Sequence, residues 1–174
     1  MKGVIALAIK ELVTERYGVL QWKEVLERAG LRKEPLLMPI SNLDDALVFK
    51  IVEAVCSTLS LSMEQLGDVF GDFWVNSYAP NLYKGYFARS RSAKDFLLNM
   101  DDLHQAMTHS LPGARPPRFE YEDLGPDSLQ IKYISHRPMF SFMVGLIKGV
   151  GRYYGTKVEI AVVAENTVRV DFQS

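Results

Sequence analysis

The sequence predicts an α+β fold, in which a helical N-terminal subdomain packs on a four-stranded antiparallel sheet that one helix crosses. Two observations predict it. Apolar residues recur at helical spacing through the first two thirds of the chain, and they alternate with polar residues through most of the last third. No linker separates the two patterns. We therefore expect a single domain over 1–174, with a helical subdomain over about 1–60 and an α+β subdomain over about 61–174.

The expected helices are bounded by glycines or by capping residues. Their ranges are 4–17, 22–29, 44–59, 63–78 and 93–111. The three longer helices each follow a residue whose side chain can cap the helix, with a polar partner three positions later. These pairs are Asn42 with Asp45, Ser62 with Gln65, and Ser92 with Asp95. The Pro112-Gly113 step is expected to end the last of these helices.

Beyond residue 118 the apolar period changes to two, which predicts strands. The alternating segments are 119–121, 129–133, 157–162 and 168–172. Glu165-Asn166 suits a hairpin turn between the last two strands. Between the second and third strands, residues 140–153 return to helical spacing, so we expect the crossing helix there.

Composition excludes several classes of protein. The chain has 20 basic and 21 acidic side chains and a formal net charge of −1, whereas a nucleic-acid-binding domain usually carries a basic excess. Its only cysteine, Cys56, excludes an internal disulfide and a cysteine-rich metal cluster. Charges interrupt every apolar stretch well before the roughly 20 residues of a membrane-spanning helix. We expect a cytoplasmic protein with no membrane insertion and no nucleic-acid partner.

The expected helix over 93–111 carries one imidazole in its apolar stripe. His104 falls on that stripe, away from the side that presents Asp101 and Asp102. A neutral histidine bonded to backbone is the commoner occupant of such a position, and a metal ligand is the alternative. Both interpretations stand at this point. The stripe consists of Leu97, Met100, Leu103, Met107 and Leu111.

The second expected strand has a face that changes from apolar to polar along its length. Side chains alternate across a strand, so this face consists of Leu129, Ile131, Tyr133, Ser135 and Arg137. A guanidinium beside two hydroxyls suits a carboxylate or a phosphate. The alternative is a strand that simply leaves the core, with its arginine in solvent.

Aromatic side chains are concentrated in one region and in the crossing helix. Such stripes are most often core. An apolar slot, an inward histidine and an anion-binding cluster are nevertheless what a large planar cofactor with two carboxylates requires. The apolar residues concerned are Phe70, Phe73, Trp74, Tyr78, Tyr83, Tyr86, Phe87, Phe140, Phe142 and Leu146.

Together these features resemble the haem–nitric oxide/oxygen binding (H-NOX) domain, the bacterial relative of the haem domain of soluble guanylate cyclase, over essentially the whole chain. The segment 133–137 matches the family's YxSxR motif, and residues 100–104 match the proximal helix that carries the axial histidine. Residues 113–118 match a segment whose second proline presses on the porphyrin, and residues 145–147 match a distal segment whose leucine lies over the haem. The resemblance therefore implies an H-NOX fold that binds haem b.

The resemblance also implies a role for each matching residue. His104 would be the iron ligand, and Tyr133, Ser135 and Arg137 would bind the haem propionates. The remaining haem contacts would be Pro117, Ile5, Leu146, Met100 and Leu103, and the distal pocket would contain Phe142, Trp74, Tyr78 and Ile9.

One departure from the family pattern concerns gas selectivity. Oxygen-binding members place a tyrosine five residues after the motif arginine, and here that position is Phe142, while the position of a supporting asparagine falls near Trp74. Bound dioxygen carries partial negative charge and gains from a hydrogen-bond donor, which a ferrous nitrosyl needs much less. We therefore expect nitric oxide to be favoured over dioxygen. Tyr78, Tyr83 and Tyr86 are the other hydroxyls of this region.

The resemblance implies a sensor of nitric oxide and carbon monoxide with no catalytic activity of its own. Gas binding would weaken the bond between iron and His104 and shift the helical part against the α+β part. We expect signalling in trans to a histidine kinase, as in two-component systems, or to a diguanylate cyclase or phosphodiesterase. The alternatives are a haem enzyme that turns over nitric oxide or peroxide, and a haem-free interaction module of the same fold.

Overall fold

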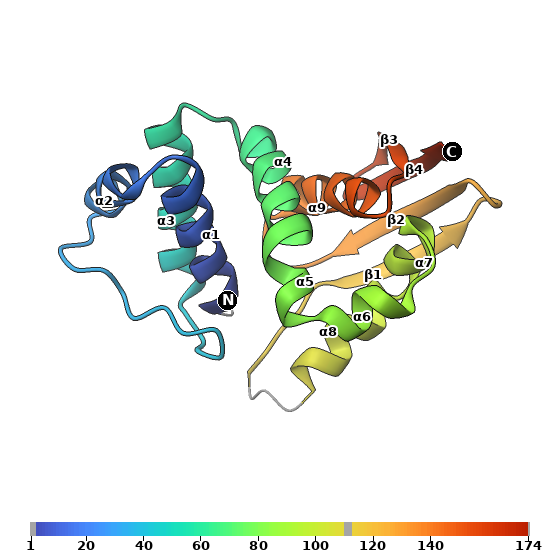
Figure 1. Ribbon diagram of the computed structural model, residues 1–174, viewed down its shortest axis with the longest axis horizontal. Helices are drawn as coiled ribbons and strands as arrows, with labels where there is room; N and C mark the ends of the chain where they lie inside the picture. Colours follow the sequence, from blue (N-terminus) through green and yellow to red (C-terminus); the bar gives the residue numbers. More distant parts are fainter. Residues whose placement is uncertain (1–2, 110–112, 174) are drawn as a thin grey trace. The chain divides into compact units, whose positions relative to one another are not determined.

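The computed structural model describes residues 3–109 and 113–173 and confirms the α+β class. Its described part divides into two compact units, residues 3–66 with 113–114 and residues 67–109 with 115–173 (Figure 1). In that part of the chain no single helix has both the length and the apolar composition to cross a membrane. The helices Asp45–Leu59 and Met63–Leu82 meet that test only as a bent pair.

The first unit is helical. It contains α1 (Gly3–Arg16), α2 (Val19–Arg28), α3 (Asp45–Leu59) and the first turn of α4 (Met63–Phe73). The first three helices contact one another, and their apolar faces form the core of this unit. Its fully buried side chains include Ile9, Leu12, Val13, Val25, Ile51, Val52 and Val55.

The capping pairs expected here have different outcomes. Ser62 and Gln65 form the predicted reciprocal box: the Gln65 amide donates to Ser62 Oγ at 3.2 Å and the Ser62 amide to Gln65 Oε1 at 2.8 Å. Asn42 is not the cap of α3. The chain is still extended at Asp44, directly before the helix, and its carboxylate accepts from the Ala46 amide at 3.1 Å. Only the residue next to the first helical turn can reach its free amides.

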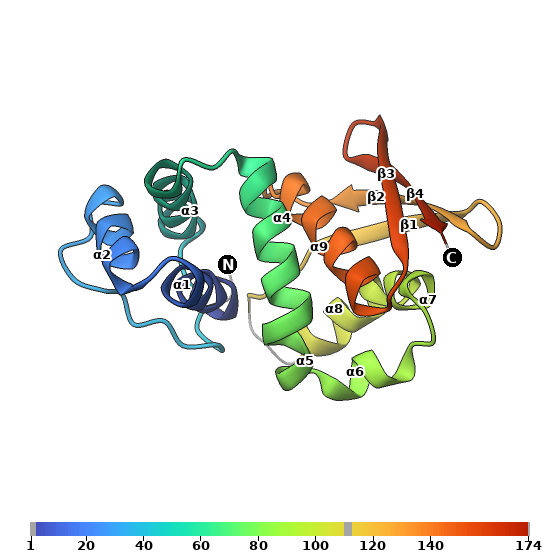
Figure 2. The same cartoon turned by 45° about the horizontal axis from the view of Figure 1, so that its top comes forward.

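The second unit contains the four predicted strands and the crossing helix. The strands are β1 (Arg118–Asp123), β2 (Ser128–Ile134), β3 (Lys157–Ala164) and β4 (Thr167–Gln173), in the order β1-β2-β4-β3 and antiparallel throughout. The predicted hairpin joins β3 to β4, with Asn166 in the left-handed region at φ 51°. Helix α9 (Phe140–Tyr153) has the predicted range and lies between α4 and the sheet (Figure 2).

The expected helix over 93–111 is broken in the structure. It becomes α7 (Ala93–Leu98), capped by Ser92 as predicted, and α8 (Met100–Thr108). Asn99 causes the break, because its side-chain amide donates to the Asp95 carbonyl at 2.7 Å. That carbonyl would otherwise accept from the Asn99 backbone amide, which bonds to Phe96 instead. The expected end at Leu111 and Pro112 lies outside the described residues.

Two further features were not predicted. The helix that begins at Met63 continues beyond Phe73 as a π-helical turn, η1 (Trp74–Tyr78). The chain then forms two short helices, α5 (Ala79–Leu82) and α6 (Lys84–Arg89). A π-turn inside a longer helix is uncommon and is often found at functional sites.

Glycines let α4 and α9 cross at backbone contact. Gly67 and Gly71 lie four residues apart on α4, as Gly145 and Gly149 do on α9, so each pair shares one helix face. A Cβ atom on Gly71 would overlap the Gly145 carbonyl group, and one on Gly145 would overlap the Gly67 carbonyl. Asn76 closes the far end of the crossing by donating to the Gly149 carbonyl at 3.2 Å.

Two ion pairs border this crossing. Lys148 lies 2.7 Å from the Asp68 carboxylate, and Arg152 lies 2.9 Å from the Asp72 carboxylate. All four side chains are about one third exposed or more, and pairs of this kind contribute little to stability. The close backbone approach therefore determines the crossing.

We expect Gly71→Ala to lower the free energy of unfolding by about 3 kcal/mol, because the added methyl group meets backbone that cannot move aside. Gly85→Ala is the matched control: it lies in α6, and a Cβ there has nothing within 4 Å. That variant should be neutral or stabilised by about 0.5 kcal/mol. Urea unfolding measures both, and equal midpoints would contradict the crossing described here.

Candidate functional site

Helix α8 presents His104 with one ring nitrogen already bonded. The Nδ1 atom lies 2.8 Å from the Met100 carbonyl oxygen. A carbonyl can only accept, so Nδ1 carries the proton and Nε2 keeps its lone pair in the neutral ring. Burial lowers the pKa of His104, which favours this neutral form. In this tautomer Nε2 is the ring nitrogen that is available to bind a metal.

The sequence places His104 on an apolar stripe that is expected to face the core. In the structure, the part of this stripe on α8 is not fully buried. None of the described side chains of α8 is fully buried. Met100, Leu103, His104 and Met107 are all half-buried. The nearest ring to the imidazole is that of Phe119 on β1, with ring centroids 5.5 Å apart. The bond from Nδ1 to the Met100 carbonyl fits both interpretations of His104, so its role as a metal ligand stays a prediction.

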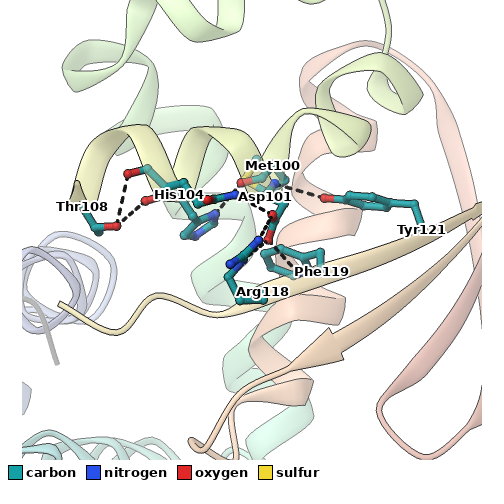
Figure 3. Close-up of polar contacts among 8 residues, drawn as sticks. Met100, Asp101, His104, Thr108, Arg118, Phe119 and Tyr121 are labelled. Atoms are coloured by element: carbon teal, nitrogen blue, oxygen red, sulfur yellow. Dashed lines mark hydrogen bonds and ion pairs between the residues drawn. The ribbon is translucent and has the colours of Figure 1, made fainter.

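The carboxylate of Asp101 joins the first turn of α8 to β1 (Figure 3). Arg118 donates to both carboxylate oxygens, from Nε and Nη2, at 2.8 Å each. The Phe119 amide donates to Oδ1 at 2.9 Å and the Gln105 side chain to Oδ2 at 2.9 Å. The hydrogen bonds from Arg118 are the main reason that the pKa of Asp101 falls to about 2. The sequence pattern had shown Asp101 only as part of a charged helix side.

The structure brings the three residues of the polar strand face together. Tyr133 is buried near the end of β2, and the Ser135 side chain lies close enough to its hydroxyl to lower the pKa of Tyr133, against the larger effect of burial. Ser135 Oγ accepts from the Arg137 amide at 3.1 Å. Burial raises the pKa of Tyr133, so the hydroxyl remains a donor. One expectation is corrected: β2 ends at Ile134, and Ser135 and Arg137 continue its inward face from a turn rather than from the strand.

Pro117 lies in a segment that is held at both ends. At one end, Arg137 Nη1 donates to the Arg115 carbonyl at 2.7 Å. At the other end, Phe119 is opposite Tyr133 in the sheet, with ring centroids 5.9 Å apart. The half-buried Pro117 lies between these anchors. The sequence places Arg115 in the segment 113–118 and Phe119 at the start of a predicted strand, but it does not show that these two residues hold the ends of the Pro117 segment.

Phe142, Trp74 and Tyr78 form a chain of aromatic contacts through Phe70. The ring centroid of Phe70 lies 5.2 Å from that of Phe142 and 5.8 Å from that of Trp74. Trp74 stacks on Tyr78 at 5.3 Å, and Phe142 is only 3% exposed. Leu146 is half-buried one turn along α9 from Phe142.

Ile5 and Ile9 lie on α1 of the first unit, where Ile5 is half-buried and Ile9 fully buried. The roles expected for these two side chains stay predictions.

The donor set fits haem better than a metal centre made only of protein ligands. The described residues contain no group of three or more histidine, cysteine, aspartate or glutamate side chains that could hold a metal ion. One oriented imidazole together with an arginine and two hydroxyls is what an iron macrocycle with two carboxylates needs.

The chain matches the family described as haem-NO-binding over residues 2–162. It belongs to the haem-NO-binding, or H-NOX, family. Among solved structures, a Cs H-NOX mutant with the unnatural amino acid 4-cyano-L-phenylalanine has a TM-score of 0.89 at 24% identity and covers 100% of this chain and 97% of its own. An oxygen-binding H-NOX domain, described as related to soluble guanylate cyclases, has a TM-score of 0.84 at 24% identity, with 100% and 96% covered.

Curated relatives of this H-NOX chain are much longer proteins. Soluble guanylate cyclase gcy-34 of Caenorhabditis elegans is 29% identical over 87% of the chain, which is 23% of that protein. Soluble guanylate cyclase 89Da of Drosophila melanogaster is 25% identical over 94% of the chain, which is 25% of that protein. The chain thus spans about a quarter of the length of these relatives. It is a haem-binding gas-sensor domain related to soluble guanylate cyclase.

We expect the stability that Asp101 provides to depend on pH. Its pKa is about 2 in the fold and 3.8 ordinarily, so the contribution is present above pH 4 and is lost as pH falls toward 2. Asp101→Asn should lower the free energy of unfolding by about 1 kcal/mol at neutral pH and by progressively less below pH 4. Urea unfolding at several pH values measures this. Glu120→Gln, which removes an exposed partner of Lys132, should show almost no cost, and an equal cost for both variants would contradict the assignment.

Proposed function

We propose that this domain senses nitric oxide through a ferrous haem b that His104 holds as the single protein ligand. The observation that carries the proposal is the hydrogen bond from His104 Nδ1 to the Met100 carbonyl, which leaves Nε2 available for iron. Membership of the haem-NO-binding family supports the same role. When bound, the haem would supply the iron centre that accepts a diatomic gas, including carbon monoxide.

The polar cluster at the end of β2 would bind the haem propionates. Arg137 supplies a planar, permanently charged donor, and Tyr133 and Ser135 add single hydroxyl donors to the same place. Because Arg137 also holds the Arg115 carbonyl, the propionate site and the Pro117 segment share one anchor. Pro117, Met100, Leu103, Leu146 and Ile5 are the proposed apolar contacts.

Selectivity for nitric oxide over dioxygen would come from an apolar gas-binding side. Phe142 is buried among aromatic carbons and offers no hydrogen-bond donor. Dioxygen bound to ferrous iron would therefore lack the donor that stabilises its partial charge. A nitrosyl is less polarised, so the missing donor would cost it little stability. Trp74, Tyr78 and Ile9 are the proposed neighbours on this side.

Signalling would follow from a change at His104. His104 lies on α8, none of whose described side chains is fully buried and whose first turn is hydrogen-bonded to β1, so a change in the bond between imidazole and iron would act directly on this helix. We propose that the gas shifts the population between two packings of the helical and α+β subdomains, divided near residue 60. The domain would act on a histidine kinase or a cyclic-di-nucleotide enzyme and catalyse no reaction itself.

We expect His104→Ala to purify with little haem, and to retain haem when imidazole is supplied, because the free base replaces the lost ligand. Absorption spectra of the reduced protein, with and without imidazole, measure this. His109→Ala is the matched control, since this exposed histidine follows α8 directly and should leave the spectrum unchanged. Unchanged five-coordinate haem in His104→Ala would remove His104 from the proposed role.

We expect the reduced wild-type protein to keep its spectrum in air and to change it with nitric oxide. Phe142→Tyr should introduce dioxygen binding, because it adds a donor at the family's position. The dioxygen dissociation constants of the two proteins measure the effect. A stable dioxygen complex in the wild type would contradict the proposed selectivity, and loss of that complex in Tyr78→Phe or Tyr83→Phe would identify the donor responsible.

A further inference from the structure

Strand β1 contacts the peptide group that orients His104. The carbonyl of the peptide bond between Met100 and Asp101 accepts from His104 Nδ1 at 2.8 Å. The N–H of the same peptide group donates to the hydroxyl of Tyr121 at 3.2 Å. One peptide unit is therefore bonded to the imidazole at one end and to a side chain of β1 at the other (Figure 3).

The Asp101 side chain attaches the same peptide group to β1 a second time. Its two oxygens accept a two-point contact from Arg118 and a third bond from the Phe119 amide. The Asp101 side chain is only 14% exposed, although its partner Arg118 is 54% exposed, whereas both partners of the Lys132–Glu120 pair on the same sheet are more than half exposed. Paired, partly sheltered charges hold a geometry better than exposed ones do.

We infer that Asp101, Arg118 and Tyr121 are positioning residues for His104: they fix the Met100–Asp101 peptide to β1 and so set the strength of the bond between imidazole and iron. The inference rests on the proposed function of His104. Nothing in it requires these residues to touch the haem.

The physical reason is hydrogen-bond cooperativity along the peptide. Donation from the Asp101 amide to Tyr121 polarises the peptide group and makes the Met100 carbonyl a better acceptor. A stronger hydrogen bond from Nδ1–H to that carbonyl makes the imidazole a more basic ligand. Loosening this peptide should therefore weaken the bond from imidazole to iron without removing the ligand.

The test measures the iron–imidazole stretching band of the reduced, gas-free holoprotein by resonance Raman spectroscopy. We expect Arg118→Ala, Asp101→Asn and Tyr121→Phe to move the band to lower wavenumber. Arg118→Lys keeps the charge but loses the two-point contact, so its band should lie between the bands of the wild type and Arg118→Ala. Lys132→Ala, which breaks the exposed pair on the same sheet, is the matched control and should leave the band in place.

A second background separates positioning from a general change in the haem environment. In His104→Ala reconstituted with free imidazole, the ligand is no longer attached to α8, so adding Arg118→Ala should not move the band. An unmoved band in Arg118→Ala alone, or an equal shift in the imidazole-loaded background, would overturn the inference.

Failure of the proposed function gives a different result. If His104 is not the ligand, His104→Ala without imidazole keeps the wild-type band. If His104→Ala loses the band but Arg118→Ala leaves it unmoved, the proposed function stands and only the inference about β1 is overturned.

Discussion

The backbone contact between α4 and α9 is the constraint on which the second unit depends. Gly67 and Gly71 face Gly145 and Gly149 so closely that a single methyl group would force the helices apart. This contact brings Phe142 on α9 against Phe70 on α4, and it places η1 beside α9. The aromatic group proposed to face the gas is thus fixed by residues that have no side chains of their own.

A second constraint acts on the segment from Arg115 to Phe119. Arg137 holds its first carbonyl, Asp101 holds its last amide, and sheet pairing with Tyr133 fixes its direction. Pro117 lies between these anchors, and the Phe119 ring lies against the His104 ring of α8. The proposed iron ligand, the propionate cluster and Pro117 are therefore linked through this segment by hydrogen bonds and by strand pairing.

Much of the fold followed from sequence pattern, and the departures have local physical causes. Alternation predicted all four strands, and helical spacing predicted α9 with its observed range. The expected long helix is broken at Asn99, because the Asn99 side chain donates to the Asp95 carbonyl in place of its own backbone amide. The candidate site was predicted as residue types, namely a histidine on an apolar stripe and hydroxyls with an arginine on one strand face. Asp101 and Tyr121 were missed because their partners are 17 to 20 residues away in the chain.

The sequence by itself determined the α+β class, the strand faces and the residue types of the candidate site, because each of these follows from periodicity or from the chemistry of single side chains. Tertiary structure alone decided which nitrogen of His104 keeps its lone pair, how Asp101 joins α8 to β1, and how closely α4 approaches α9. Those features arise when groups distant in sequence meet at hydrogen-bonding or contact distance. A one-dimensional pattern contains the groups, but not their distances.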